Sequence, residues 1–317
     1  MKSIKTTIAA VATLASTIAF GGGLYIVSGG DFRSPILQYE VTTTENNQTT
    51  NPAPYNVNSA WSFKVDGVET SVAGGNNSRV PFTFQAEGVH KVKVYGTTSK
   101  PQPVATFNYN NKEHSRHLGG NLIVNRCVLT AQYTTFTNIT FRNVEKVATM
   151  ALAFNDKVTT VTFEGNEPLV IGDRAFAFVT KLPQIEIPDN VVEFERCAIE
   201  FCDKLNTITL PNKVFPISTN LYYTNTSNFN CVFRKTPIKR VNFKGSLQDW
   251  NANPYYVHIL GEPYETQNED GSYTLKPSAH AAYLRQVVLD FGITGTNANC
   301  SFCDNSEGGL IKLYVNQ

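Results

Sequence analysis

The sequence carries little charge and almost no excess of either sign. Of its 317 residues, 27 are Lys or Arg and 26 are Asp or Glu, which gives 17% charged residues and a formal net charge of +1. Proteins that bind nucleic acid or an anionic membrane usually carry a basic excess, because the partner presents closely spaced negative charges. The charge balance therefore predicts no nucleic-acid partner and disfavours an anionic membrane surface.

The sequence also lacks the motifs of common enzyme active sites. It has no Ser, Cys or Thr nucleophile in an elbow turn, and its glycine-rich stretch at 21–30, GGGLYIVSGG, neither follows a strand nor precedes a βαβ unit. Asp189, Glu193 and Glu195 are spread over one turn and are expected to lie in solvent. The sequence predicts a protein that is not an enzyme, has no catalytic residue and needs no cofactor.

Potential metal ligands are few and poorly spaced. His114 and His117, beside Glu113, form an HxxH-like cluster, but no further His or Cys lies at a spacing that completes a zinc site of three or four ligands. Cys300 and Cys303 form a C-x-x-C pair in the turn half of a repeat, where a small buried residue is expected. We predict no metal site, and for the cysteine pair a structural role, with a disulfide as the main alternative.

The first thirty residues differ from the rest of the chain. Lys2 and Lys5 precede an uncharged run with an Ala/Ile/Leu-rich segment from Ile8 to Phe20, and small residues follow it. This is the pattern of a secretory signal peptide, with a possible cleavage after Gly21. A membrane anchor or a buried N-terminal helix is the alternative, because the uncharged run is just long enough to span a bilayer.

A 23-residue repeat is clearest at residues 171–214. Setting Ile171 over Phe194 brings Ala175 over Ala198, Leu182 over Leu205 and Pro188 over Pro211. Self-similarity at a fixed period of this size is typical of a solenoid, in which stacked units bury a continuous apolar core together.

A looser pattern extends the repeat over the second half of the chain. An apolar residue is followed three and five positions later by two more, and the last two are expected on one side of a short strand. The turn segments upstream, such as RAFAFVTK, pack small beside large residues, and Cys202 in CAIEFCDK is expected to be a packing residue. The seven triplets are Phe136/Ile139/Phe141, Val158/Val161/Phe163, Leu182/Ile185/Ile187, Leu205/Ile208/Leu210, Ile238/Val241/Phe243, Leu284/Val287/Leu289 and Leu310/Leu313/Val315.

The repeat AIEFCDKLNTITLP resembles the BspA-like leucine-rich repeat of bacterial surface proteins and of proteins from phages that infect such bacteria. The stretch VNFKGSLQDW also matches that family's Gly-Ser-x-x-x-Trp continuation. The resemblance covers about residues 125–317. It implies a leucine-rich-repeat solenoid and a role in recognition.

Residues 34–97 show a different, two-residue period. Trp61, Phe63 and Val65 alternate with polar residues and run into Asp66-Gly67, a tight hairpin signal. We expect a small antiparallel β-sandwich. The segments WSFKVDG and FTFQAEGVHKVKVYG resemble the polycystic-kidney-disease-type immunoglobulin-like domain, although the Trp-Gly pair of its usual turn is absent and His90 stands where an aromatic residue is usual. This resemblance implies a spacer or adhesion module.

The repeat is interrupted twice by segments rich in tyrosine. Insertions in a repeat array project from one face, which is often the binding face. Tyrosine supplies a large amphipathic contact area at low entropy cost, and aromatic rings can stack on sugars. We favour a surface role for Tyr222 and Tyr223; for Trp250 and Tyr255 a role in the insertion's own core is equally favoured. The candidate binding residues are Tyr222, Tyr223, Trp250, Tyr255, Tyr256, Tyr264 and Tyr273.

The expected fold is mainly β: an immunoglobulin-like sandwich at 31–97, a linker at 98–120, and a solenoid at 121–317 with insertions at 215–230 and 245–280, after an N-terminal segment at 1–30. The expected function is that of a non-enzymatic extracellular or cell-surface binding protein that recognises a host or bacterial surface protein or glycan. The alternative is a phage virion component, such as a fibre, decoration or receptor-binding protein that contacts neighbouring subunits. The oligomeric state does not follow from the residues.

Overall fold

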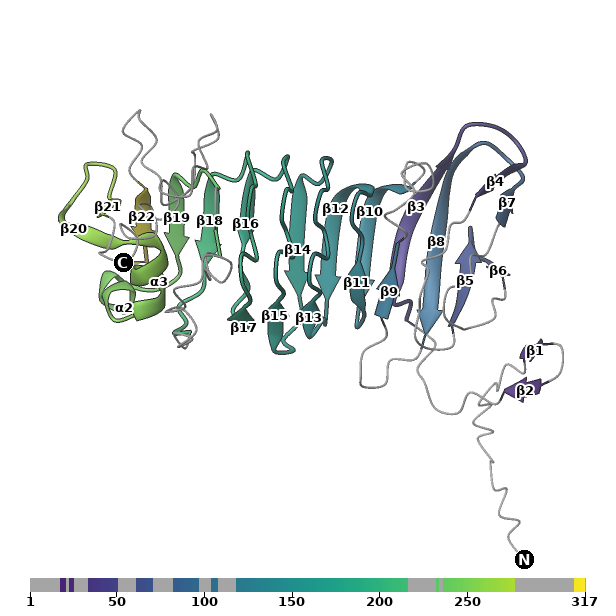
Figure 1. Ribbon diagram of the computed structural model, residues 1–317, viewed down its shortest axis with the longest axis horizontal. Coiled ribbons are helices and arrows are strands. Elements are labelled where there is room, and N and C mark those ends of the chain that lie inside the picture. Colours follow the sequence, from purple (N-terminus) through teal and green to yellow (C-terminus); the bar gives the residue numbers. More distant parts are fainter. Residues whose placement is uncertain are drawn as a thin grey trace, which may run out of the picture.

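The computed structural model describes residues 18–20, 23–25, 34–50, 61–70, 82–96, 104–107, 118–215, 232–233, 236–276 and 311–316. Strands account for 47% of the structure and helices for 6%, which confirms the prediction of a mainly β fold. In Figure 1 the strands stand side by side along the long axis, with an antiparallel part at the N-terminal end and the helices at the other.

A row of parallel strands forms the main wall of the molecule, and we call it the parallel ladder. Its strands are β10 (Leu118–Asn125), β12 (Thr135–Arg142), β14 (Thr160–Glu164), β16 (Gln184–Glu186), β18 (Thr207–Leu210), β19 (Arg240–Phe243) and β22 (Lys312–Val315). The middle residues of the predicted triplets pair across it: Ile139 with Val161, Ile185 with Ile208, and Val241 with both Ile208 and Leu313. β16 contacts β14 and stands beside it in Figure 1.

Shorter parallel strands form a second wall. β9 (Val104–Thr106) pairs with β11 (Val128–Thr130), and β15 (Leu169–Ile171) pairs with both β13 (Lys146–Val147) and β17 (Val191–Phe194). Apolar side chains from both walls and from the turns between them are buried in one core, as the period-two alternation requires.

Compact turns join the two walls, and each turn repeats the same backbone conformation. In these turns, two residues four positions apart adopt positive φ, for example Met150 and Phe154 in one turn and Arg174 and Phe178 in the next. Between them, Ala175 and Phe176 are fully buried, and the equivalent pairs in the neighbouring turns are buried as well. The predicted packing of a small residue beside a large one is confirmed.

Four rings at the ends of these turns form a continuous column, which we call the aromatic stack. Tyr133, Phe154, Phe178 and Phe201 follow one another with centroid distances of 4.9, 4.9 and 4.5 Å and interplanar angles of 3°, 11° and 5°. All four have positive φ and are half-buried. Because each inner ring has neighbours on both faces, the stack presents ring edges to solvent.

The N-terminal part is antiparallel. β3 (Leu37–Thr43) pairs with β8 (Gly88–Gly96), β8 with β5 (Trp61–Val65), and β5 with β6 (Val68–Thr70), while β4 (Gln48–Thr50) pairs separately with β7 (Phe82–Phe84). Phe63 of β5 contacts the ring of Phe82, so the two sheets meet through aromatic side chains. Further upstream, β1 (Ile18–Phe20) and β2 (Gly23–Tyr25) pair as strands, within the segment whose alternatives included a helix.

This antiparallel sheet continues directly into the parallel ladder. β3 pairs with β10, and the sheet order is β14-β12-β10-β3-β8-β5-β6. Within the predicted linker at 98–120, residues 104–106 form β9 and residues 118–120 begin β10. β9 pairs with β11, and β3 satisfies the backbone groups of β10 that would otherwise form an open edge.

The predicted hairpin at Asp66-Gly67 is confirmed. Both residues have positive φ, 50° and 86°, as a tight turn between β5 and β6 requires. Asp66 accepts a hydrogen bond from the Lys91 backbone N–H at 2.8 Å, and its other oxygen lies 2.7 Å from Nδ1 of His90. His90, which stands where the resembled family has an aromatic residue, is buried against the ring of Phe84 and holds this turn.

The C-terminal insertion forms an end cap. It contains α2 (Leu247–Asn251), α3 (Pro254–Leu260) and the antiparallel strands β20 (Glu262–Gln267) and β21 (Tyr273–Lys276), which are joined by a turn at Asp270-Gly271. β21 pairs with β22, so the sheet ends in the order β19-β22-β21-β20. The triplet Leu284/Val287/Leu289 lies outside the described residues. In the described part of the ladder, β19 pairs directly with β22.

Candidate recognition surface

The structure buries three of the seven aromatic residues predicted to contact a ligand. Trp250 and Tyr256 are 0% exposed and Tyr255 is 3% exposed. Trp250 and Tyr256 stack on each other and both contact the ring of Phe243 in β19. These three residues therefore lie in the insertion's own core, which was the equally favoured alternative for Trp250 and Tyr255, because packing α2 and α3 against the ladder end requires apolar rings at these positions.

Each polar group of the two largest buried rings has a hydrogen-bond partner. Nε1 of Trp250 donates to the Gly261 carbonyl at 3.1 Å, and the hydroxyl of Tyr256 donates to the Pro211 carbonyl at 3.2 Å. Burial raises the pKa of the Tyr256 hydroxyl, which keeps the ring neutral. Trp250 thus ties α2 to the end of α3, and Tyr256 ties α3 to the segment that follows β18.

Both short helices begin at well-formed caps. Ser246 accepts from the Asp249 N–H at 3.1 Å, and Asp249 accepts from the Ser246 N–H at 2.8 Å, which is a complete capping box. The hydrogen bond from the Ser246 N–H to the carboxylate is the main cause that lowers the pKa of Asp249. Asn253 caps α3 and also donates to the Lys213 carbonyl at 2.8 Å.

The other predicted binding tyrosines divide into two pairs. Tyr264 on β20 is 44% exposed, with the Lys276 ammonium 6.0 Å from its ring centroid, and Tyr273 on β21 is partly exposed. These two remain available to a ligand, so their predicted role stays a prediction. Tyr222 and Tyr223 lie outside the described residues.

The outer face of the parallel ladder is a flat, polar surface. One outward row runs through Gln184, Thr207, Arg240 and Lys312, and the adjacent row runs through Glu186, Thr209, Asn242 and Tyr314. Neighbouring strands in a sheet lie about 4.8 Å apart, so each row presents side chains at a regular spacing. Towards the N-terminal end, Asn138, Thr140, Thr160 and Thr162 continue the pattern with hydroxyl and amide groups.

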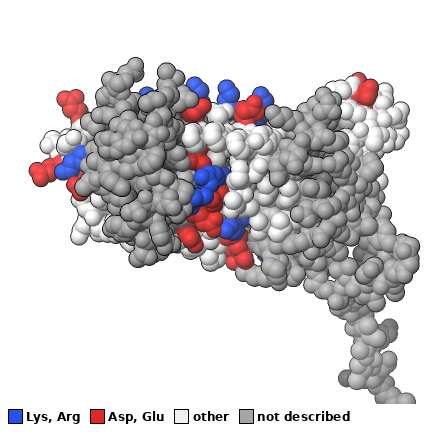
Figure 2. Space-filling model, in the orientation of Figure 1, with Lys and Arg blue, Asp and Glu red and all other residues white. Residues whose placement is uncertain are grey.

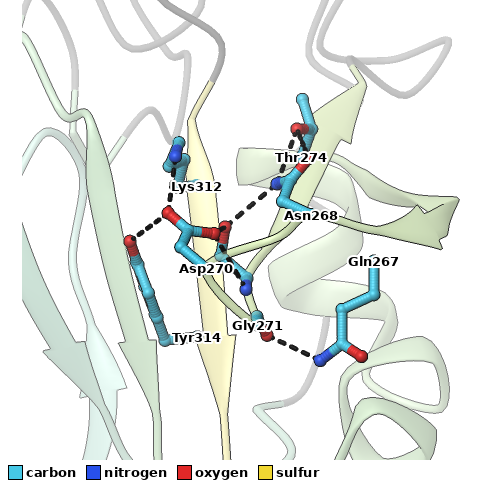
Figure 3. A network of polar contacts seen from close by, with 8 residues as sticks. Gln267, Asn268, Asp270, Gly271, Thr274, Lys312 and Tyr314 are labelled. Carbon is cyan, nitrogen blue, oxygen red and sulfur yellow. Dashed lines mark hydrogen bonds and ion pairs between the residues drawn. The ribbon is translucent and has the colours of Figure 1, made fainter.

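A polar network fastens the end cap to this face (Figure 3). Asp270, at the tip of the β20–β21 turn, accepts from the Lys312 ammonium at 2.6 Å and from the Tyr314 hydroxyl at 3.1 Å. It also accepts from the hydroxyl of Ser272 at 2.5 Å. The bond from Lys312 is the main cause that lowers the pKa of Asp270, and the same contact raises the pKa of Lys312.

Arg240 occupies a distinct position beside this network. Its guanidinium carbon lies 3.9 Å from the centroid of the Tyr314 ring, and its Nε donates to Oδ1 of Asn242 at 2.9 Å. Asn242 in turn donates to the Thr209 hydroxyl at 3.3 Å. Sequence reasoning missed Arg240, Lys312 and Tyr314 as candidates, although the triplets predict that residues flanking Val241 and Leu313 point outward.

The second wall and the turns that follow its strands carry charges of both signs in close contact. Arg174 donates to Glu200 at 2.8 Å, Arg196 donates to Asp173 at 3.1 Å, and Lys146 pairs with Glu195. Figure 2 shows positive and negative side chains close together at the centre of the view. Each of the three ion pairs joins residues of different repeats, so the pairs help to hold the stacked repeats together.

Of the cysteines discussed above, the structure describes Cys202, which has a structural role. Cys202 is fully buried and donates to the Phe176 carbonyl at 3.0 Å, and burial raises its pKa to about 12, so its packing role is confirmed. His114, His117, Cys300 and Cys303 lie outside the described residues. Within the part of the chain that the structure describes, no group of three potential ligands could hold a metal ion. Among the same residues, no helix is both long and apolar enough to cross a membrane.

The comparison with protein families identifies the repeat. Residues 132–257 match the model for the BspA type leucine rich repeat region in six copies, a span that runs from the start of the aromatic stack into α3. The searches of curated proteins and of solved structures returned no match. The part of the chain that builds β12 to α3 therefore carries BspA-type leucine-rich repeats, a scaffold that is typically used for binding and not for catalysis.

Proposed function

We propose that this protein is a non-enzymatic extracellular binding protein that recognises a protein or glycan partner with the outer face of the parallel ladder and the adjoining end cap. The observation that carries the proposal is the flat row of outward Thr, Asn, Gln and Arg side chains on a scaffold of BspA-type repeats. Stacked repeats commonly use an extended surface of this kind for recognition. The core fixes the backbone, so the face is pre-organised and little conformational entropy is lost on binding.

The N-terminal antiparallel part acts as a spacer in this proposal, as its resemblance to an immunoglobulin-like module implies. It extends the same sheet and offers β6 as the last strand of that sheet.

A matched pair of substitutions tests where recognition occurs. Thr162 and Val192 are both exposed β-branched residues on strands, the first on the ladder and the second on β17 of the second wall. The labelled full-length protein is applied to a printed panel of extracellular proteins and glycans. We expect Thr162→Trp to remove binding by steric obstruction and Val192→Trp to retain it. Equal binding by both variants, or loss with Val192→Trp alone, would contradict the proposal.

Export belongs to the same proposal. A basic residue pair followed by an apolar segment supports a signal peptide at residues 1–30. Mass spectrometry of the mature protein is expected to find a new N-terminus near Gly22. An intact Met1 in a protein assembled with other particle subunits would instead favour the virion role.

A further inference from the structure

We infer that Arg240 is the centre of a site for the anionic group of an acidic glycan, a carboxylate or a sulfate ester, on the outer face of the parallel ladder. The inference rests on the proposed recognition function and names a ligand class for that surface.

The Arg240 side chain is already held in one orientation. Tyr314 lies under the guanidinium with 3.9 Å from its ring centroid to the guanidinium carbon, and Asn242 accepts from Nε at 2.9 Å. Among the described residues, no hydrogen bond or ion pair engages its two terminal NH₂ groups, while the residue is exposed. An arginine fixed by stacking loses little further entropy when it binds a ligand.

Three other cations on or beside the ladder strands are paired with carboxylates. Arg142 donates to Glu164 at 2.6 Å, and Lys312 donates to Asp270 at 2.6 Å. Lys244 bonds both Glu186 and Asp189. Arg240 differs from these cations because the side chain that it is hydrogen-bonded to, Asn242, is uncharged.

The two terminal NH₂ groups of Arg240 have the geometry to bind an oxyanion. Two parallel N–H groups can bond two oxygens of one carboxylate or sulfate, a geometry that lysine cannot reproduce. The neighbouring positions then decide what else the ligand must contain. Thr207 stands beside Arg240 in register and Gln184 stands beside Thr207, so hydroxyl and amide groups extend about 10 Å along the row.

This arrangement favours a glycan over an acidic peptide. A sugar carries hydroxyls that both donate and accept, and it can bond the Thr, Gln and Asn side chains of a flat polar face. Peptides are commonly bound by strand addition at an open edge or through apolar pockets. Both edges of β19 are already paired, with β18 and β22, so strand addition at Arg240 is blocked.

Immobilised polysaccharides provide the test, with the full-length protein as the analyte. The probes are polygalacturonate, which carries carboxylates, dextran sulfate, which carries sulfates, uncharged dextran, and poly-L-glutamate. We expect binding to one or both acidic polysaccharides and not to dextran, and binding to one acidic polymer alone identifies the anion. Arg240→Lys is expected to weaken this binding about tenfold or more while keeping the charge.

Two control variants distinguish bidentate binding by the Arg240 guanidinium from non-specific electrostatic attraction. Arg142→Lys makes the same chemical change at a paired arginine of the same parallel ladder, and Lys239→Ala removes a charge next to Arg240. Both are expected to bind within about twofold of the wild type. The inference is overturned if either acts like Arg240→Lys, if neither acidic polysaccharide binds the wild type, or if poly-L-glutamate binds as tightly as they do. If Thr162→Trp removes panel binding and Arg240→Lys changes nothing, recognition by the ladder face stands and the anion site does not.

Discussion

At the scale of single residues, backbone conformation explains an unusual use of aromatic side chains. Phe154, Phe178 and Phe201 adopt positive φ, a region that costs an L-residue roughly 1–2 kcal/mol relative to the ordinary helical region. The repeat keeps a bulky residue there because each ring stacks on the ring of the neighbouring turn. Local strain is offset by a contact that exists only when repeats stack.

This account predicts an inverted ranking of two substitutions at Phe178. Both Phe178→Ala and Phe178→Gly lose the ring contacts, but glycine adopts φ of 58° without the steric cost that alanine retains. We expect the glycine variant to be the more stable of the two by about 1 kcal/mol in urea-induced unfolding. A glycine variant that is less stable than the alanine variant, as at an ordinary buried position, would contradict the strain argument.

The core positions of the repeat behave as conventional packing sites. Leu205 is fully buried between the turn that contains Cys202 and the strand β18. Leu205→Ala leaves a cavity and is expected to lower the free energy of unfolding by about 2 to 5 kcal/mol. Lys204→Ala, at the exposed neighbour, serves as the control and should change it by less than about 0.5 kcal/mol. Equal effects of the two substitutions would show that the repeat is not packed as described.

At the scale of elements, the end cap depends on the start of α2. Ser246 and Asp249 complete a capping box, and the helix they begin carries Trp250 into the core. Ser246→Ala should therefore lower the free energy of unfolding by about 1 kcal/mol. Gln248→Ala, on the exposed side of the same helix, should be close to neutral. Circular dichroism melts of both variants make the comparison.

The contact between the end cap and the ladder is expected to resist mild acid. The pKa of Asp270 is lowered chiefly by Lys312, so the carboxylate contributes its full effect above its unfolded pKa of about 4 and loses it only as pH falls through the lower folded value. Carbon-detected NMR of the Asp270 carboxyl should show no titration between pH 7 and pH 4. In Lys312→Met the titration should move up toward pH 4, and an unchanged midpoint would remove Lys312 as the cause.

At the scale of the whole molecule, the N-terminal part shares one sheet with the first ladder strands, β10, β12 and β14. Removing residues 1–97 would strip β3 from β10 and expose a long row of unpaired backbone groups on a flat edge. We expect the truncated chain 98–317 to self-associate or precipitate, as measured by size-exclusion chromatography with light scattering. A monomeric truncated chain with the melting temperature of the full protein would show that the two parts are independent.

The sequence predicts the ladder better than its surroundings, for physical reasons. Residues such as Ile139, Ile185 and Val241 repeat at a spacing that stacking imposes, so their burial follows from the period alone. Trp250 and Tyr256 break that period, and an aromatic residue in an insertion suits a surface or a small core equally well until its neighbours are known. The pairing of β3 with β10 leaves no local pattern, because it joins segments about eighty residues apart.

Carbene footprinting of the full-length protein, with and without the partner that the panel identifies, tests the central claim most directly. The account predicts reduced labelling of outward residues on the ladder, including Gln184, Thr207, Arg240 and Tyr314, and unchanged labelling of Val192 on the second wall. Reduced labelling confined to the second wall or to the aromatic stack would contradict it.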